Sequence, residues 1–244
     1  RDRRSTSRTR FTPMVFMREG GFTIRTLTED HEKIEAYVLR HRIFAEELGW
    51  VPASKTLMEV DEYDRKSTFL GVFNERDQLV AFARLILTGG KFMIEEEFSS
   101  LIGAWHTIRK QDDTAEVSRL CVSPEARTLS VAGNFGVHHV SMLLYKGIFQ
   151  LCRKNNIRYI YIVVEYKIFR MFLAKGFQCR LVGEPLRMAD GCVAVAAMVD
   201  FDELVSVNSV KRPEFTKWFT QYRSDRSQSP LPQPESCSPL AASA

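Results

Sequence analysis

The pattern of apolar and polar residues divides the chain into short strands and amphipathic helices. In the N-terminal half, β-branched and aromatic runs predict three strands, of which the last two form a hairpin: Phe22–Leu27, Thr68–Phe73 and Leu79–Leu87. After the first strand, apolar residues recur at helical spacing, which predicts a helix that Thr28 or Asp30 caps and that ends at Leu48. A second, short helix is expected around Glu95–Leu101.

The C-terminal half alternates strands with helices. Helices are expected at Val131–Lys154 and at Tyr166–Ala174, and Gly176 is placed as the C-cap of the second. The strands predicted here are Ala115–Val122, Tyr159–Val164, Gln178–Val182 and Cys192–Asp200. A meander followed by this alternation predicts an α/β (α+β) sandwich, in which helices flank a single twisted mixed sheet.

The two ends differ in composition from the middle. Residues 1–20 begin with the basic, Ser/Thr-rich run Arg1–Arg10 and are predicted to form a disordered leader ahead of a start near Met17. Residues 223–244 are rich in Ser, Pro and Ala and are predicted to form a disordered tail. One folded domain is therefore expected at residues 21–222.

Composition narrows the class of protein. The chain has 244 residues, 45% hydrophobic and 26% charged, which is typical of a globular protein. The longest apolar run, Val193–Val199, is far shorter than the roughly 20 residues of a membrane span, and the net charge of +4 is too small to indicate a nucleic-acid partner. Five scattered cysteines and the isolated pair His138 and His139 indicate no disulfide framework and no metal site, which favours a cytoplasmic protein.

Two segments of the N-terminal half carry candidate chemistry. Arg40 and Phe44 are one turn apart on the predicted helix, and Trp50 follows as that helix ends. Asp61 and Asp64 are three residues apart in a stretch bracketed by apolar residues. Taken alone, aromatic residues usually belong to a core and an acidic pair usually belongs to a solvated loop.

Two predicted strands contain charged residues. Arg84 stands in an otherwise apolar strand, where a cation needs either the sheet edge or a carboxylate. Glu116 and Arg119 lie in the next strand and are expected on opposite faces if that strand is regular. Such an arrangement is often no more than a structural ion pair.

The order and spacing of these residues resemble the LuxI family of acyl-homoserine-lactone synthases. The family pattern is R-x-x-x-F-x-x-x-x-x-W, then D-x-x-D, then an Arg in a strand, then E-x-S-R. Every position is filled here: Arg40, Phe44, Trp50, Asp61, Asp64, Arg84, Glu116 and Arg119.

The resemblance implies a GNAT-like fold and an acyltransferase that makes the lactones used in quorum sensing. In that reaction the amine of S-adenosylmethionine attacks an acyl thioester, and the methionyl carboxylate then displaces methylthioadenosine to close the lactone. S-adenosylmethionine is a substrate, and no cofactor is implied.

The resemblance also implies roles for the motif residues. Glu116 is the expected base, because an α-amino group with a pKa of about 8 must lose a proton before it attacks. The sulfonium needs a nearby carboxylate and the substrate carboxylate needs a guanidinium. The catalytic set expected is Glu116, Arg119, Asp64 and Arg84. The S-adenosylmethionine-binding set expected is Arg40, Phe44, Trp50 and Asp61.

The acyl donor is expected to be acyl carrier protein or acyl-CoA. Lys146–Arg180 contains eight cations and only one acid, so Arg153, Lys154 and Arg158 are predicted to dock an acidic carrier protein; an ordinary solvated face is the alternative. The segment Arg127–Gly133 lacks the pyrophosphate-binding loop of acetyl-CoA enzymes, which also favours the carrier protein.

The strand segment Tyr161–Tyr166 bears on the acyl chain, because many family members that take 3-oxoacyl chains carry a Ser or Thr there. This chain has neither, so an unsubstituted chain is expected.

Two other classes of function remain open at this stage. An N-acyl amino acid synthase, or another GNAT-type N-acyltransferase, would use the same base but release no methylthioadenosine. A catalytically silent acyl-binding protein would turn over no thioester at all.

Overall fold

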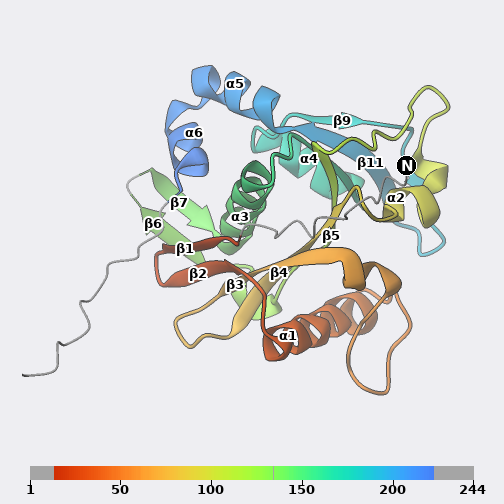
Figure 1. Cartoon of the computed structure of the whole chain (residues 1–244), viewed down its shortest axis with the longest axis horizontal. Helices are drawn as coiled ribbons and strands as arrows, with labels where there is room; N and C mark the ends of the chain where they lie inside the picture. The colour runs from red at the N-terminus through yellow and green to blue at the C-terminus, as the bar shows by residue number, and fades with distance from the viewer. Residues whose placement is uncertain (1–13, 134, 223–244) are drawn as a thin grey trace, which may run out of the picture.

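The computed structural model describes residues 14–133 and 135–222, shown in Figure 1. Within these residues, nine strands form one mixed sheet in the order β1-β2-β3-β4-β5-β8-β11-β10, with β9 paired to β11. The strands of this sheet are β1 (Phe16–Glu19), β2 (Phe22–Thr26), β3 (Ser67–Phe73), β4 (Leu79–Leu87), β5 (Thr114–Val122), β8 (Tyr159–Glu165), β9 (Cys179–Leu181), β10 (Leu186–Arg187) and β11 (Val193–Asp200). The predicted class, a single mixed sheet flanked by helices, is confirmed.

Helices cover both faces of the sheet. The helices are α1 (Asp30–Arg40) with its π-helical continuation η1 (His41–Glu47), η2 (Glu62–Lys66), α2 (Met93–Glu96), η3 (Ser99–Leu101), η4 (Pro124–Ala126), α3 (Val140–Lys154), α4 (Tyr166–Ala174), α5 (Phe201–Lys211) and α6 (Pro213–Thr220). The buried side chains of α3 to α6 form one core on one face, and those of α1, η1 and α2 form two smaller cores on the other. Within the described residues, no helix is long and apolar enough to span a membrane.

Strands β5 and β8 run side by side for only part of their length. Thr114–Val117 of β5 pairs in parallel with Tyr159–Ile162 of β8. This is the only parallel pairing in the sheet among the described residues. Beyond Val117, β5 continues beside β4 to Val122, whereas β8 continues beside β11 to Glu165. The sheet therefore opens between two central strands.

A β-bulge in β5 overturns one expectation. Arg84 pairs with Ser118 and Phe82 with Cys121, so two β5 residues, Arg119 and Leu120, stand opposite the single residue between them on β4. Arg119 has a φ of +53°, in the left-handed region. The bulge brings its side chain to the face that also holds Glu116, so the prediction that these two lie on opposite faces is wrong.

The segment before α3 also differs from the prediction. Instead of one helix over Val131–Lys154, the chain forms the hairpin β6 (Ser130–Gly133) and β7 (Gly136–His139) before α3 begins. Gly136 has a φ of +113°, which suits the end of a tight turn and not a helix. His138, which falls within the predicted helix, lies on β7 instead and stacks on Trp218 with ring centroids 3.6 Å apart.

The N-terminal boundary needs a correction as well. The leader was predicted to run to residue 20, yet β1 pairs with β2 over Phe16–Glu19, and Val15 and Met17 are buried. Residues 1–13 and 223–244, where the rest of the leader and the tail were predicted, lie outside the described residues. The α1 cap is Glu29, whose backbone N–H donates to Glu32, and not Thr28 or Asp30.

Candidate active site

An acidic turn is the starting point of the site. Asp61 caps the short helix η2: its Oδ1 accepts the backbone N–H of Tyr63 at 3.0 Å, and its own N–H donates to Asp64 Oδ2 at 2.9 Å. This reciprocal cap explains the three-residue spacing, because it fixes both carboxylates on one side of the turn. The remaining oxygens of Asp61 and Asp64 face the sheet.

Two arginines meet on Asp64. Arg40, at the end of α1, and Arg84, in the middle of β4, both place Nη1 2.7 Å from Asp64 Oδ1, and Arg84 also binds Asp61. Both guanidiniums are fully buried. Arg84 Nε donates to Ser118 Oγ at 2.9 Å, which ties the group to the bulged strand. Arg40, Asp61, Asp64 and Arg84 therefore form one contiguous group of ion pairs.

Glu59 joins this group, although the sequence did not single it out. Its Oε1 lies 2.9 Å from Arg119 Nη2, and its other oxygen accepts from Arg40 Nε. Burial would raise the pKa of Glu59, but the hydrogen bonds from Arg119 and Arg40 lower it below its usual value. The sequence signal that pointed to Glu59 was its position at the start of the acidic run that contains Asp61.

The group balances its charge internally, with guanidiniums from Arg40, Arg84 and Arg119 and carboxylates from Glu59, Asp61 and Asp64. Burial would lower the pKa of Arg40, but hydrogen bonds to Asp64 and Glu59 raise it above its usual value. Buried charges of this kind are tolerated only when each is paired, so removal of one partner is costly. Arg119 and Asp61, joined at 2.9 Å, are the members with the most side-chain exposure, 14% and 19%.

An aromatic pair borders the group on its Arg119 side. Phe44 and Trp50 stack with ring centroids 6.2 Å apart and an interplanar angle of 29°. The Arg119 guanidinium lies 5.6 Å from the Phe44 centroid, and Trp50 is 43% exposed. The backbone N–H of Trp50 donates to the Phe44 carbonyl at 2.8 Å, which holds the pair at the end of η1. The exposed face of this aromatic pair is accessible to a planar or cationic ligand.

Glu116 lies on the same face of β5 but outside the ion-pair group. It is 1% exposed, and both carboxylate oxygens accept the N–H of Ile94, at 3.2 and 3.4 Å. Burial raises its pKa to about 7, and the N–H groups of Met93 and Ile94 oppose that rise only in part. A carboxyl with this pKa is well suited to accept and return a proton at neutral pH. The thioether of Met93 separates it from the network, since Arg84 Nη2 donates to Met93 Sδ at 2.8 Å.

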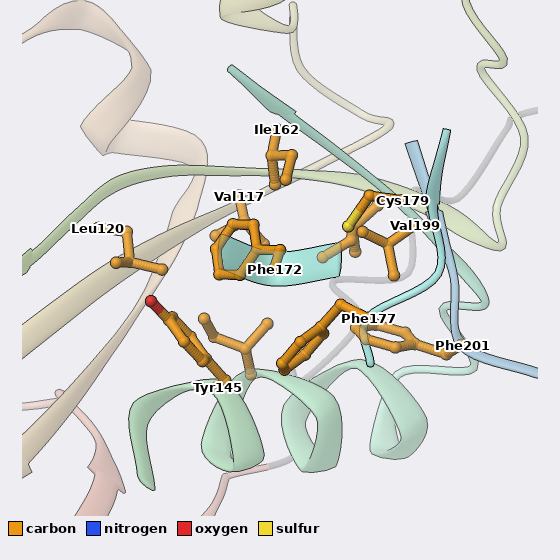
Figure 2. Close-up of a pocket in the computed structure, with 11 residues that line it drawn as sticks. Val117, Leu120, Tyr145, Ile162, Phe172, Phe177, Cys179, Val199 and Phe201 are labelled. Carbon is orange, nitrogen blue, oxygen red and sulfur yellow. The ribbon is translucent and has the colours of Figure 1, made fainter. Parts of the chain in front are cut away.

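An apolar pocket lies on the opposite face of the sheet (Figure 2). It has a volume of about 40 Å³ and runs between the sheet and α3, from Val117 and Leu120 of β5 to Val199 and Phe201. Leu120 belongs to the part of β5 that has separated from β8. The pocket therefore begins where the sheet opens, and Glu116 lies across the sheet from it.

The three residues predicted to dock a carrier protein do not belong to this site. Arg153 forms an ion pair with Asp202, and Arg158 pairs with Asp200. Lys154 donates to the Tyr222 hydroxyl at 2.7 Å. They lie around the end of α3 and the start of β8, where β8 is still paired with β5. The structure therefore gives no added support to docking at these residues. In the part of the chain that is described, no cluster of three or more His, Cys, Asp or Glu side chains could hold a metal.

Comparison with known proteins identifies the family. The family model described as "Autoinducer synthase" matches residues 25–208. A probable acyl-homoserine-lactone synthase of Sinorhizobium fredii is 28% identical over 159 residues, which are 65% of this chain and 74% of that protein. The acyl-homoserine-lactone synthase of Vibrio anguillarum is 24% identical over 60% of this chain and 74% of its own length.

Solved structures share the fold. The CoA-dependent acyl-homoserine lactone synthase BjaI, with SAM and isopentyl-CoA, has a TM-score of 0.64 at 22% identity and covers 80% of this chain and 89% of its own. TofI, in a ternary complex with an inhibitor and MTA, has a TM-score of 0.61 at 21% identity, over 74% of this chain and 91% of its own. Since the family model covers most of the chain and the motif residues converge in one site, the chain belongs to the autoinducer synthase family.

Proposed function

We propose that this acyltransferase joins an acyl group to S-adenosylmethionine and closes the product into an N-acyl-L-homoserine lactone. The observation that carries the proposal is the position of Glu116, a buried carboxyl with a pKa of about 7 that lies across the opened sheet from an apolar pocket. The arginine and carboxylate group beside it supplies partners for a substrate that carries charges of both signs.

The first step is acyl transfer. Glu116, directly or through a water molecule, takes a proton from the substrate ammonium, and the free amine attacks the thioester carbonyl. The nitrogen then loses its second proton as the tetrahedral intermediate collapses and the carbon–sulfur bond breaks; the departing thiolate takes up that proton, and Glu116 releases the first one to solvent. This step needs the amine on the Glu116 face and the carbonyl at the opening between β5 and β8.

The second step closes the ring. The methionyl carboxylate oxygen attacks the carbon next to the sulfonium, the carbon–sulfur bond breaks, and methylthioadenosine leaves as a neutral thioether. Arg119 and Asp61 are the residues placed to meet the substrate, because they are the most exposed members of the network. The Arg119 guanidinium is suited to bind the methionyl carboxylate of the substrate, and the Asp61 carboxylate is suited to lie near its sulfonium. Arg40, Arg84 and Asp64 are more deeply buried and position these two side chains.

The donor is a thioester of pantetheine, carried by acyl carrier protein or by CoA, and the reaction takes place in the cytoplasm, where both are made. Docking of a carrier protein at Arg153, Lys154 and Arg158 remains a prediction. Glu substitutions at Arg153 and Lys154 test it: a higher KM for acyl carrier protein thioesters, with an unchanged KM for acyl-CoA and for S-adenosylmethionine, would support docking there. An unchanged KM for every substrate would exclude it.

The deciding experiment incubates the purified protein with S-adenosylmethionine and a panel of acyl carrier protein and CoA thioesters. Mass spectrometry then follows methylthioadenosine and the acyl lactone. Equal amounts of both products are expected, and the panel identifies chain and carrier. Consumption of thioester without methylthioadenosine would instead indicate an N-acyl amino acid synthase or another N-acyltransferase, and no turnover would indicate a silent acyl-binding protein.

A further inference from the structure

Helix η1 leads to the aromatic pair, but only its first half is anchored in the core. His41, Ile43 and Phe44 are buried, whereas every side chain in the range Ala45–Trp50 is at least partly exposed. The hydrogen bond from the Trp50 N–H to the Phe44 carbonyl is local to the turn. Burial of side chains alone therefore does not fix the position of Trp50.

An ion pair ties the second half of η1 to another part of the chain. Arg127 presents both terminal nitrogens to Glu47, with Nη1 2.7 Å from Oε1 and Nη2 2.7 Å from Oε2. The hydrogen bonds from Arg127 are the main reason that the pKa of Glu47 lies below its usual value. Two parallel hydrogen bonds between planar groups fix both their distance and their orientation. Glu47 precedes Trp50 by three residues, so this pair acts close to the exposed end of η1.

Arg127 is itself fixed relative to strand β5. Its Nε donates to the carbonyl of Val122, the last residue of that strand, at 3.2 Å. The turn η4 between them is anchored by Ala126, which is 1% exposed. The same strand carries Arg119, whose guanidinium lies 5.6 Å from the Phe44 ring centroid. The ion pair therefore connects the end of η1 to the strand that supplies Arg119 to the site.

We propose that Glu47 and Arg127 are positioning residues that hold Trp50 in place against the adenosyl part of S-adenosylmethionine. The inference rests on the proposed function and deepens it. Neither side chain meets the reacting atoms, and both act through Trp50. The side chains of Glu47 and Arg127 are 36% and 43% exposed, so dissolved salt screens their attraction. Affinity for S-adenosylmethionine therefore depends on ionic strength.

A second ion pair between the same two parts of the chain supplies a matched control. Arg42, near the start of η1, binds Glu125 of η4 through both terminal nitrogens. The buried side chains of His41 and Ile43 already fix this end of the helix. Glu125→Gln therefore removes an exposed ion pair of similar geometry and should leave Trp50 where it is.

The kinetic test measures KM for S-adenosylmethionine by release of methylthioadenosine. Glu47→Gln should raise this KM about threefold to fivefold, the range that one exposed ion pair can supply, with unchanged kcat and unchanged KM for the thioester. Arg127→Gln and the double variant should show the same increase, because either substitution already breaks the pair. Glu125→Gln should keep the wild-type KM. An unchanged KM in Glu47→Gln, or additive increases in the double variant, would overturn the inference.

Hydrogen exchange in the free protein tests the positioning without any substrate. The N–H groups of Trp50 and Val51 both donate to the Phe44 carbonyl, so their exchange reports whether the end of η1 stays closed. Mass spectrometry should show faster exchange at these amides in Glu47→Gln, and unchanged exchange in Glu125→Gln. Wild-type protein in about 0.5 M salt should behave like Glu47→Gln, which makes the test independent of any variant.

The two measurements separate this inference from the reaction. If no variant releases methylthioadenosine, the proposed function fails, and hydrogen exchange still reports whether the ion pair holds Trp50. Exchange that neither salt nor Glu47→Gln accelerates would overturn the inference even if the protein makes the lactone.

Discussion

Both carboxylate oxygens of Glu116 accept the same backbone N–H, that of Ile94, at 3.2 and 3.4 Å. A Gln at this position can still accept that hydrogen bond but cannot take a proton from an ammonium group. Glu116→Gln should therefore fold normally and lose about 100- to 10,000-fold in kcat for acyl transfer, the usual contribution of a general base. Glu96→Gln, on the exposed side of α2, is the matched control and should keep full activity. A fully active Glu116→Gln would remove Glu116 from the mechanism.

The same carboxyl should make stability depend on pH. Its pKa in the folded chain, about 7, lies above the ordinary value of 4.5, so the folded state holds the proton longer than the unfolded state does. The stabilising contribution is complete below the lower value and is lost as pH rises through the higher one, by about 3 kcal/mol in total. Urea unfolding of wild type and Glu116→Gln at about pH 5 and about pH 8 measures this difference. Parallel stabilities at the two pH values would show that Glu116 titrates normally.

Arg40 and its neighbour Arg42 offer a contrast between a buried and an exposed guanidinium. Arg40 binds Glu59 and Asp64 from inside the protein, whereas Arg42 pairs with Glu125 at the surface. Lysine carries its three N–H donors on a single nitrogen and cannot reach the two carboxylates that Arg40 binds from Nε and Nη1, so Arg40→Lys should lower the free energy of unfolding by about 2 kcal/mol and raise the KM for S-adenosylmethionine. Arg42→Lys should change neither. Equal effects of the two substitutions would show that the buried network does not depend on the guanidinium shape.

Phe172 narrows the pocket, and its replacement should change the length of chain that is accepted. Phe172→Leu removes part of the wall that faces Tyr145, so kcat/KM should shift by about tenfold toward thioesters longer by two carbons, since each buried methylene contributes about 0.8 kcal/mol. Leu173→Ala, on the exposed side of α4, is the control and should leave the length profile unchanged. If both variants keep the wild-type profile, the acyl chain does not occupy this pocket.

Much of this fold can be predicted from the spacing of apolar residues along the sequence, because strands and helices with one buried face repeat these residues at a fixed period. That periodicity predicted the hairpin of β3 and β4 and the helix α4. It also predicted the glycine at the end of α4, where Gly176 adopts a φ of +91°. The hairpin of β6 and β7 did not, because its apolar residues also fit helical spacing. The pairing of β6 with β7 and the left-handed backbone of Gly136 separate the two interpretations, and apolar spacing reveals neither.

The site, too, was predicted only in part from the sequence. The motif spacing led to the residues that converge on Asp64, yet it placed Arg119 on the wrong face, since a bulge depends on pairing with β4 and leaves little trace in the sequence of β5. Glu59 was missed for a related reason: its partners, Arg40 and Arg119, are 19 and 60 residues away along the chain.

The pairing of β5 with β8 ends at Val117 and Ile162, which leaves an opening in the sheet beyond them. In the proposed reaction the nucleoside substrate and the fatty chain approach from opposite sides of the sheet and meet at this opening. Neither has to cross the other's binding surface, so either can bind first. The two products can likewise depart in different directions, methylthioadenosine past Trp50 and the lactone by way of the α3 side.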